Sequence, residues 1–332
     1  MKIFETKIHE DDLNKINQAL LKGELGFGSN VLEFEKKFAM FSRKSQNIAV
    51  NSASAAAFII FAFLKEKYGI CDVYTTSLGF TSPAWAARHF NHNIIFVDVN
   101  EWLLFDIRDY QKRKKNSSRQ KVLMPVLYGG VSNIPGFDEE VTDEIVVVDS
   151  AHCVTPTIHS DYLFFSFHPY KPICTSDGGM ISTDNTEEAK YFRSYRNFGR
   201  YSFGPTYDIG QDGFKFYMNN LNATIGLTQL PKYFEAREVR KKNYKKLSHS
   251  YSLLPQDTLS SYYFATTLVE NADIQMASLG LSRHYPMLHK THYFSSNETL
   301  PVLENIHSKI LNLPIHQLLS KEELETLRNT NE

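Results

Sequence analysis

The chain has 332 residues, 42% hydrophobic and 22% charged, which suits a globular protein with one large α/β domain and a smaller one. Its net charge of -1 creates no field that favours nucleic acid or an anionic membrane as a partner, which weighs against a DNA-binding regulator. There is no apolar stretch near the roughly 20 residues that span a bilayer, no secretory signal pattern, and too few cysteines (Cys71, Cys153, Cys174) for a disulfide framework or a metal cage. We therefore expect a cytoplasmic protein.

Short β-branched or aromatic runs alternate with helical patterns in the first two thirds of the chain. The early helical patterns cover residues 54–68 and 83–90. Alternation of this kind, with nearly all-apolar strands, predicts an α/β fold with a mostly parallel sheet and helices on both faces. Such sheets bind ligands at the carboxyl ends of their strands. The predicted strands are 48–51, 73–77, 94–99, 122–127, 145–149, 162–167 and 179–183.

The last third of the chain does not show this alternation of strand and helix patterns. A helical pattern runs from 219 to 251, and Pro231 is expected to kink or split it. A strand is predicted at 261–269, and an amphipathic helix at 321–328. We expect a large domain over residues 1–248 and a small α+β domain over 249–332.

The terminal helix carries its own start signal. Ser320 precedes it as the N-cap, and Glu323 follows three residues later. This spacing predicts a capping box, in which each side chain accepts a hydrogen bond from the other residue's backbone N–H.

Two ionisable residues follow predicted strands. Asp149 ends the strand at 145–149, and Lys171 comes 22 residues later, after the strand at 162–167. Taken singly, Asp149 is a turn former or a helix N-cap, and Lys171 is a solvated lysine. In a parallel sheet, however, both would lie at the ligand-binding edge.

Pyridoxal phosphate needs such groups together: an amine for a Schiff base, a carboxylate for its protonated ring nitrogen, and donors for its phosphate. Asp149 could supply the carboxylate if it is ionised near the ring nitrogen. Lys171 must be unprotonated to attack, which the apolar Phe165, Phe167 and Tyr170 nearby would favour.

A phosphate site is indicated upstream, at residues 51–57. Small and polar residues there join a strand to an apolar helix, whose first N–H groups and dipole attract an anion. The alternative is a plain N-cap by Ser52 or Ser54.

These segments together resemble the DegT/DnrJ/StrS family of sugar aminotransferases, which have the type I fold of aspartate aminotransferase. The resemblance covers most of the chain, and the order and spacing of its motifs are more specific than any one motif. The motifs are Gly28…Val31-Leu32-Glu33-Phe34-Glu35…Phe38-Ala39, Asn51-Ser52-Ala53-Ser54-Ala55-Ala56, Pro125…Leu127-Tyr128-Gly129, Asp149-Ser150-Ala151-His152, Ser166-Phe167-His168…Lys171, His284-Tyr285-Pro286…Leu288-His289 and Leu313-Pro314-Ile315-His316.

The resemblance assigns roles around pyridoxal phosphate. It implies that Lys171 attaches the cofactor and that Asp149 holds its ring nitrogen. Phe80 falls where an aromatic ring stacks on the cofactor, and His152 where a side chain reaches its ring hydroxyl. The residues implied for the phosphate are Ser52, Ala53, Ser54 and Ser166.

The sequence also departs from the family pattern. Ala53 replaces a glycine, and the segment between His152 and Phe164 is shorter than in the family. Lys215 occupies the position of an asparagine that, in relatives, reaches the cofactor phosphate of the partner subunit. A lysine could bind this phosphate through its positive charge. Tyr217 occupies the position of an arginine in the family. A tyrosine cannot form the two parallel hydrogen bonds that an arginine makes with a carboxylate.

The resemblance implies a homodimer with shared active sites that moves an amino group from glutamate to a 3- or 4-keto-hexose on a nucleoside diphosphate, for amino-sugar and glycan biosynthesis. One alternative is a dehydratase of the same fold, but in that branch a histidine replaces the lysine, whereas Lys171 is present here. Another is a non-catalytic binding or regulatory protein, which the short segment and Tyr217 favour and the joint presence of Asp149, Ser166 and Lys171 disfavours.

Overall fold

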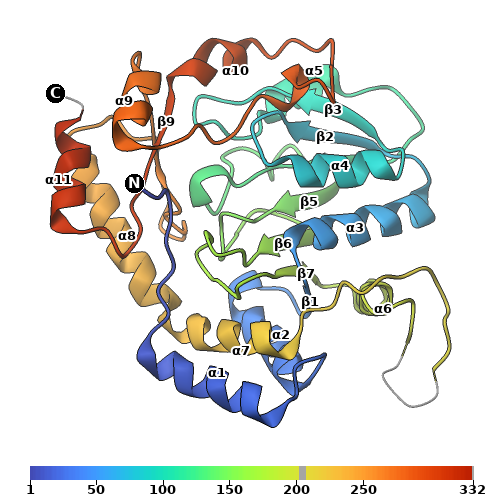
Figure 1. The fold of residues 1–332 in the computed structure, drawn as a ribbon. Helices are drawn as coiled ribbons and strands as arrows, with labels where there is room; N and C mark the ends of the chain where they lie inside the picture. Colours follow the sequence, from blue (N-terminus) through green and yellow to red (C-terminus); the bar gives the residue numbers. More distant parts are fainter. Residues whose placement is uncertain (202–206, 331–332) are drawn as a thin grey trace.

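The computed structural model describes residues 1–201 and 207–330, built around a seven-stranded sheet (Figure 1). The strand order is β1-β7-β6-β5-β4-β2-β3. Strand β7 is antiparallel to both of its neighbours, and the four remaining pairings are parallel. The mostly parallel sheet is thus confirmed. Its strands are β1 (Gln46–Val50), β2 (Asp72–Thr76), β3 (Asn93–Val97), β4 (Lys121–Met124), β5 (Ile145–Asp149), β6 (Tyr162–Ser166) and β7 (Gly179–Thr183).

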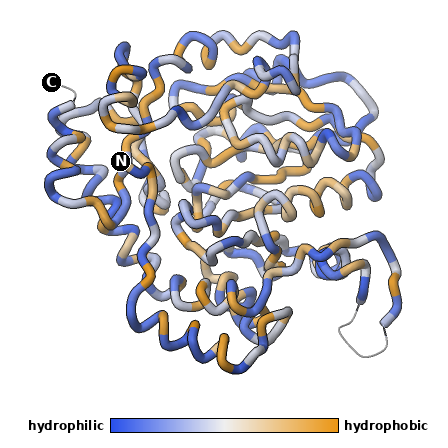
Figure 2. The backbone as a smooth tube through the Cα atoms, viewed as in Figure 1, coloured by the Kyte–Doolittle hydropathy of each residue, from blue (hydrophilic) through white to orange (hydrophobic). Residues whose placement is uncertain are grey.

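Helices cover both faces of this sheet because alternate residues of each strand point to opposite sides. On β5, Val147 packs into one apolar core, while Val146 and Val148 pack into the other. The first core lies under α3 and α6, and the second under α2 and α5. Figure 2 shows how apolar the strands and α3 are. The helices of this part are α1 (Glu10–Lys22), α2 (Ser29–Ser42), α3 (Ala53–Tyr68), α4 (Thr81–His89), α5 (Ile107–Arg113) and α6 (Thr186–Tyr195).

The long helical pattern after residue 219 is split at Pro231, as predicted. Helix α7 (Asn220–Gln229) ends in a short 3-10 turn, η2 (Leu230–Lys232), from which α8 (Tyr233–Leu247) continues. Further 3-10 turns are η1 (Tyr128–Gly130), η3 (Leu288–Lys290) and η4 (His307–Lys309).

A smaller unit follows α8 and has its own apolar cluster. This part of the chain contains the antiparallel strands β8 (Ala265–Leu268) and β9 (Ile310–Leu313) and the helices α9 (Ala272–Leu279), α10 (Pro301–Ile306) and α11 (Lys321–Asn329). Helix α10 packs through Leu303 against the apolar core that contains Val146 and Val148. We propose that this part of the chain forms the predicted small domain over 249–332, with residues 1–248 as the large domain. The capping box of Ser320 and Glu323 is confirmed.

The strand predicted at 261–269 is wrong over its first four residues. The backbone N–H groups of Ser261 and Tyr263 donate instead to the carbonyls of Gly130 and Gly129, at 2.7 and 3.1 Å. This segment therefore pairs with a turn of the large unit, and the strand begins only at Ala265. Within the described ranges, the structure contains no helix long and apolar enough to cross a membrane.

Candidate active site

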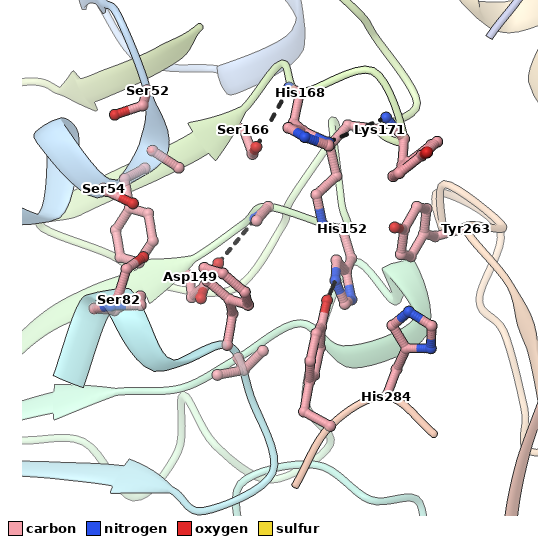
Figure 3. A pocket seen from close by; sticks show the side chains of 18 of the residues that line it. Ser52, Ser54, Ser82, Asp149, His152, Ser166, His168, Lys171, Tyr263 and His284 are labelled. Atoms are coloured by element: carbon pink, nitrogen blue, oxygen red, sulfur yellow. Dashed lines mark hydrogen bonds between the residues drawn. The ribbon is translucent and has the colours of Figure 1, made fainter. Parts of the chain in front are cut away.

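A cavity of about 430 Å³ opens at the carboxyl ends of β5 and β6 (Figure 3). The first turns of α3 and α4 form one side of it. Tyr263, His284 and Tyr285, from beyond α8, form the other side. The cavity thus lies at the sheet edge where the sequence predicted a ligand site, and between the two units of the chain.

Asp149 and Lys171 both line this cavity, as predicted. Asp149 is only 4% exposed and accepts a hydrogen bond from the N–H of Ala151 at 3.0 Å. Lys171 closes a turn after β6, in which its backbone N–H donates to the carbonyl of His168 at 2.9 Å. Parallel pairing of β5 with β6 brings the two residues to the same edge.

Burial and mutual attraction set the charges of this pair. Burial raises the pKa of Asp149 to about 6, against the opposing effect of the lysine charge. Burial lowers the pKa of Lys171 to about 8, against the opposing effect of the carboxylate. Near neutral pH the carboxylate is ionised, and part of the lysine population is an unprotonated amine.

The N-terminus of α3 faces the cavity with Ser52, Ala53 and Ser54. Ser52 is the N-cap, and its hydroxyl accepts from the N–H of Ala55 at 3.0 Å. The plain N-cap interpretation of Ser52 is therefore correct, and it does not conflict with a phosphate site. The first N–H groups of any helix lack acceptors within the helix, so they remain suited to an anion.

Strand β7 passes unusually close to this helix terminus. A Cβ at Gly179 would lie 2.5 Å from the carbonyl carbon of Ser52 and 2.6 Å from the nitrogen of Ala53. Only a glycine allows this approach. Ser166, at the end of β6, and Ser82, in the first turn of α4, add hydroxyl groups to the cavity.

His152 is buried beside these groups. Its Nε2 shares a hydrogen bond of 3.0 Å with the hydroxyl of Tyr285, and its ring lies 4.3 Å from the ring of Tyr263. Burial lowers its pKa well below the usual value, so the imidazole is neutral at neutral pH. Its Nδ1 is buried without a hydrogen-bond partner among the described residues, so it is available to a bound molecule.

Phe80 stands at the start of α4, with its ring 5.9 Å from that of Tyr285. The side chain is 57% exposed although it lines the cavity. Such a ring is available for stacking, and its role on a cofactor stays a prediction.

These residues fit pyridoxal phosphate. The cavity offers a depressed-pKa amine, a buried carboxylate, and a helix N-terminus with three nearby serine hydroxyls in Ser54, Ser82 and Ser166. The unpartnered Nδ1 of His152 is explained if a polar molecule occupies this space.

Lys215 does not line the cavity of its own chain. Its side chain is exposed, with the amine 5.7 Å from the ring centroid of Tyr217, and its carbonyl accepts from the amide of Asn51 at 3.3 Å. This position agrees with the expectation that Lys215 does not serve the cofactor site of its own subunit. Its predicted role in a partner's site stays a prediction.

The cavity residues that were not predicted as site residues include Ser82, Tyr263, His284 and Tyr285. The last two lie within a motif that resembles the family's tail. Tyr263 had no such signal because it lies in a segment read as a strand.

Comparisons with known proteins agree with this geometry. The sequence model of the DegT/DnrJ/EryC1/StrS aminotransferase family matches residues 6–330. The chain is 26% identical to the spore coat polysaccharide biosynthesis protein SpsC of Bacillus subtilis, over 96% of this chain and 92% of that protein. It is also 26% identical to the dTDP-4-dehydro-2,3,6-trideoxy-D-glucose 4-aminotransferase of Saccharopolyspora spinosa, with the same coverage of 96% and 92%.

Solved structures share the fold. The aminotransferase PseC of Helicobacter pylori superimposes with a TM-score of 0.91 at 19% identity, over 99% of this chain and 97% of that one. The PLP-form of the sugar aminotransferase Spr1654 of Streptococcus pneumoniae, described as putative, gives a TM-score of 0.89 at 21% identity, over 100% and 98%. The predicted fold is confirmed.

Proposed function

Because the chain belongs to the DegT/DnrJ/EryC1/StrS aminotransferase family, we propose that it is a pyridoxal-phosphate-dependent enzyme that aminates a keto-sugar linked to a nucleoside diphosphate. The relatives in Bacillus subtilis and Saccharopolyspora spinosa support a nucleotide-sugar acceptor and a product used in glycan biosynthesis. We propose glutamate as the amino donor and the cytoplasm as the location. The cysteines are buried free thiols, which suits a reducing compartment.

The observation that carries this proposal is the pairing of Asp149 with Lys171 at one cavity edge, opposite the N-terminus of α3. When bound, pyridoxal phosphate supplies an electron sink that stabilises a carbanion at the substrate carbon that carries the amino group. Asp149 would keep a proton on the ring nitrogen by its negative charge. Ser52, Ala53, Ser54 and Ser166 would bind the phosphate.

Lys171 would have two roles. Its amine would attach the cofactor and, once displaced by the amino donor, would move a proton to and from the reacting carbon. A pKa of about 8 suits both roles, because the group can accept and release a proton near neutral pH. His152, neutral and free at Nδ1, would orient the cofactor from the side of its ring hydroxyl.

We further propose a homodimer in which Lys215 of one subunit approaches the cofactor phosphate of the other. Its exposed side chain and its absence from the cavity of its own chain support this arrangement. A cation there would add charge at a phosphate site where Ala53 stands in place of a glycine.

The test is a pair of half-reactions on the purified protein with pyridoxal phosphate. Glutamate should discharge the visible absorption band, and a keto-sugar nucleotide should restore it. Lys171→Ala serves as the control that should show neither change. A native protein without a visible band, or with a band that glutamate and other amino acids leave unchanged, would refute the proposal. Screening keto-sugar nucleotides then identifies the acceptor.

A further inference from the structure

The segment from Ile3 to Thr6 touches the back of the turn that carries Lys171. The hydroxyl of Thr6 donates to the carbonyl of Pro169 at 2.8 Å and lies 3.4 Å from the carbonyl of Lys171 itself. Both carbonyls belong to the turn closed by the bond from the Lys171 N–H to His168. Thr6 thus holds this turn from outside the sheet.

The same segment also supports the lysine side chain, through Tyr263. Phe4 is 1% exposed, and its ring lies 5.1 Å from that of Tyr263. On the cavity side, the amine of Lys171 lies 4.8 Å from the centroid of the Tyr263 ring. Figure 3 shows Tyr263 beside Lys171 and His152. Phe4 therefore backs the aromatic surface on which the amine rests.

The segment is fixed in place by two glutamine side chains. Gln229, at the end of α7, donates to the carbonyl of Lys7 at 3.4 Å. Gln317, beyond β9, donates to the carbonyl of Glu5 at 3.2 Å. Because Gln229 precedes residue 249 and Gln317 follows it, this N-terminal stretch connects the lysine turn to both parts of the chain.

From these contacts we infer that residues 3–6 position Lys171: Thr6 holds its backbone turn, and Phe4 holds the Tyr263 ring against its amine. Lys171 lies in the 12-residue connection 167–178 between β6 and β7, so the strands alone do not fix it. A reacting amine must be held to within a fraction of an ångström for efficient chemistry. Thr6 and Phe4 are positioning residues, because they touch neither the cavity's charged groups nor the reacting atoms. The inference rests on the proposed role of Lys171.

The test replaces Thr6 in the full-length chain. Thr6→Val keeps the shape and removes the hydroxyl, while Thr6→Ser keeps the hydroxyl. Thr326→Val is the matched control, because the Thr326 hydroxyl makes a similar bond to a backbone carbonyl, that of Glu322, at 2.9 Å on the exposed face of α11. Hydrogen exchange of the Lys171 amide reports the turn, and the rate at which added pyridoxal phosphate is bound covalently reports the side chain.

Thr6→Val should speed exchange of the Lys171 amide about tenfold and slow cofactor capture severalfold, since the turn loses one hydrogen bond. Thr6→Ser and Thr326→Val should both behave like the native chain. The inference is overturned if the amide exchanges within about twofold of native in Thr6→Val, or if exchange rises equally in β6 and β7, which would mean general destabilisation. Failure of the native chain to bind the cofactor would instead refute the proposed function, while the exchange result would still decide the role of Thr6.

Discussion

The carboxylate of Asp149, at the end of β5, and the amine of Lys171, in the connection after β6, face one cavity, and each charge opposes the effect of burial on the other. Without Asp149 the lysine would be still less protonated, and without Lys171 the carboxylate would be still less ionised. The pKa values of the two groups, about 6 for Asp149 and about 8 for Lys171, therefore lie on either side of neutral pH.

The first prediction concerns the site of attachment. Borohydride reduction of the protein with pyridoxal phosphate should fix the cofactor on Lys171, because this is the described lysine that lines the cavity and has a depressed pKa. Peptide mapping by mass spectrometry measures the label. A label on another lysine, with Lys171 unmodified, would contradict the assignment.

The second prediction concerns pH. Only the unprotonated amine attacks, so the rate of cofactor capture should rise with pH and level off above a midpoint near pH 8. Asp149→Asn removes the charge that raises the pKa of Lys171, so the midpoint should move to lower pH. Stopped-flow absorbance across a pH series measures this. Asp177→Asn is the control, since Asp177 lines the same cavity but is not among the groups that shift this pKa. A midpoint that is equal in both variants would show that Asp149 does not act on the lysine.

The third prediction separates binding from chemistry. Asp149→Asn should slow the half-reaction with glutamate by several orders of magnitude, on the order of 10³-fold or more, because a neutral amide cannot hold the proton on the ring nitrogen. The amide has nearly the same shape, so cofactor affinity should fall much less. Single-turnover kinetics and equilibrium titration measure the two effects. Near-native single-turnover rates would remove Asp149 from the mechanism.

The fourth prediction tests the close approach of β7 to α3. Gly179→Ala would place a methyl group 2.5 Å from backbone atoms of Ser52, so the start of α3 must shift. We expect the free energy of unfolding to fall by about 1–3 kcal/mol and cofactor affinity to fall with it. Gly26→Ala, whose Cβ would meet nothing within 4 Å, is the control and should stay within about 0.5 kcal/mol of native. Unchanged affinity in Gly179→Ala would show that the α3 terminus does not hold the phosphate.

The sheet was predictable from sequence because its strands are short apolar runs buried on both faces, such as Ile145–Asp149. The pairing of Asp149 with Lys171 was predictable because both follow parallel strands. The role of Thr6 was not, since its partner Lys171 lies 165 residues away and a single hydroxyl leaves no periodic signal. Tyr263 was hidden for a different reason: its segment is apolar enough to be read as a strand but hydrogen-bonds to the turn at Gly129.

The last prediction concerns the shared site. If Lys215 completes the phosphate site of the partner, the inactive variants Lys171→Ala and Lys215→Glu should complement each other when mixed and reassembled. In the hybrid dimer one site would carry both lesions and the other neither, so up to about half of a native dimer's activity per hybrid should return. A mixture of Lys171→Ala with Asp149→Asn is the control: both residues line the cavity of one chain, so every hybrid site would keep one lesion and stay inactive. Native mass spectrometry verifies that heterodimers form. Heterodimers without activity in the first mixture, or an active monomer of the native chain, would show that Lys215 does not act across an interface.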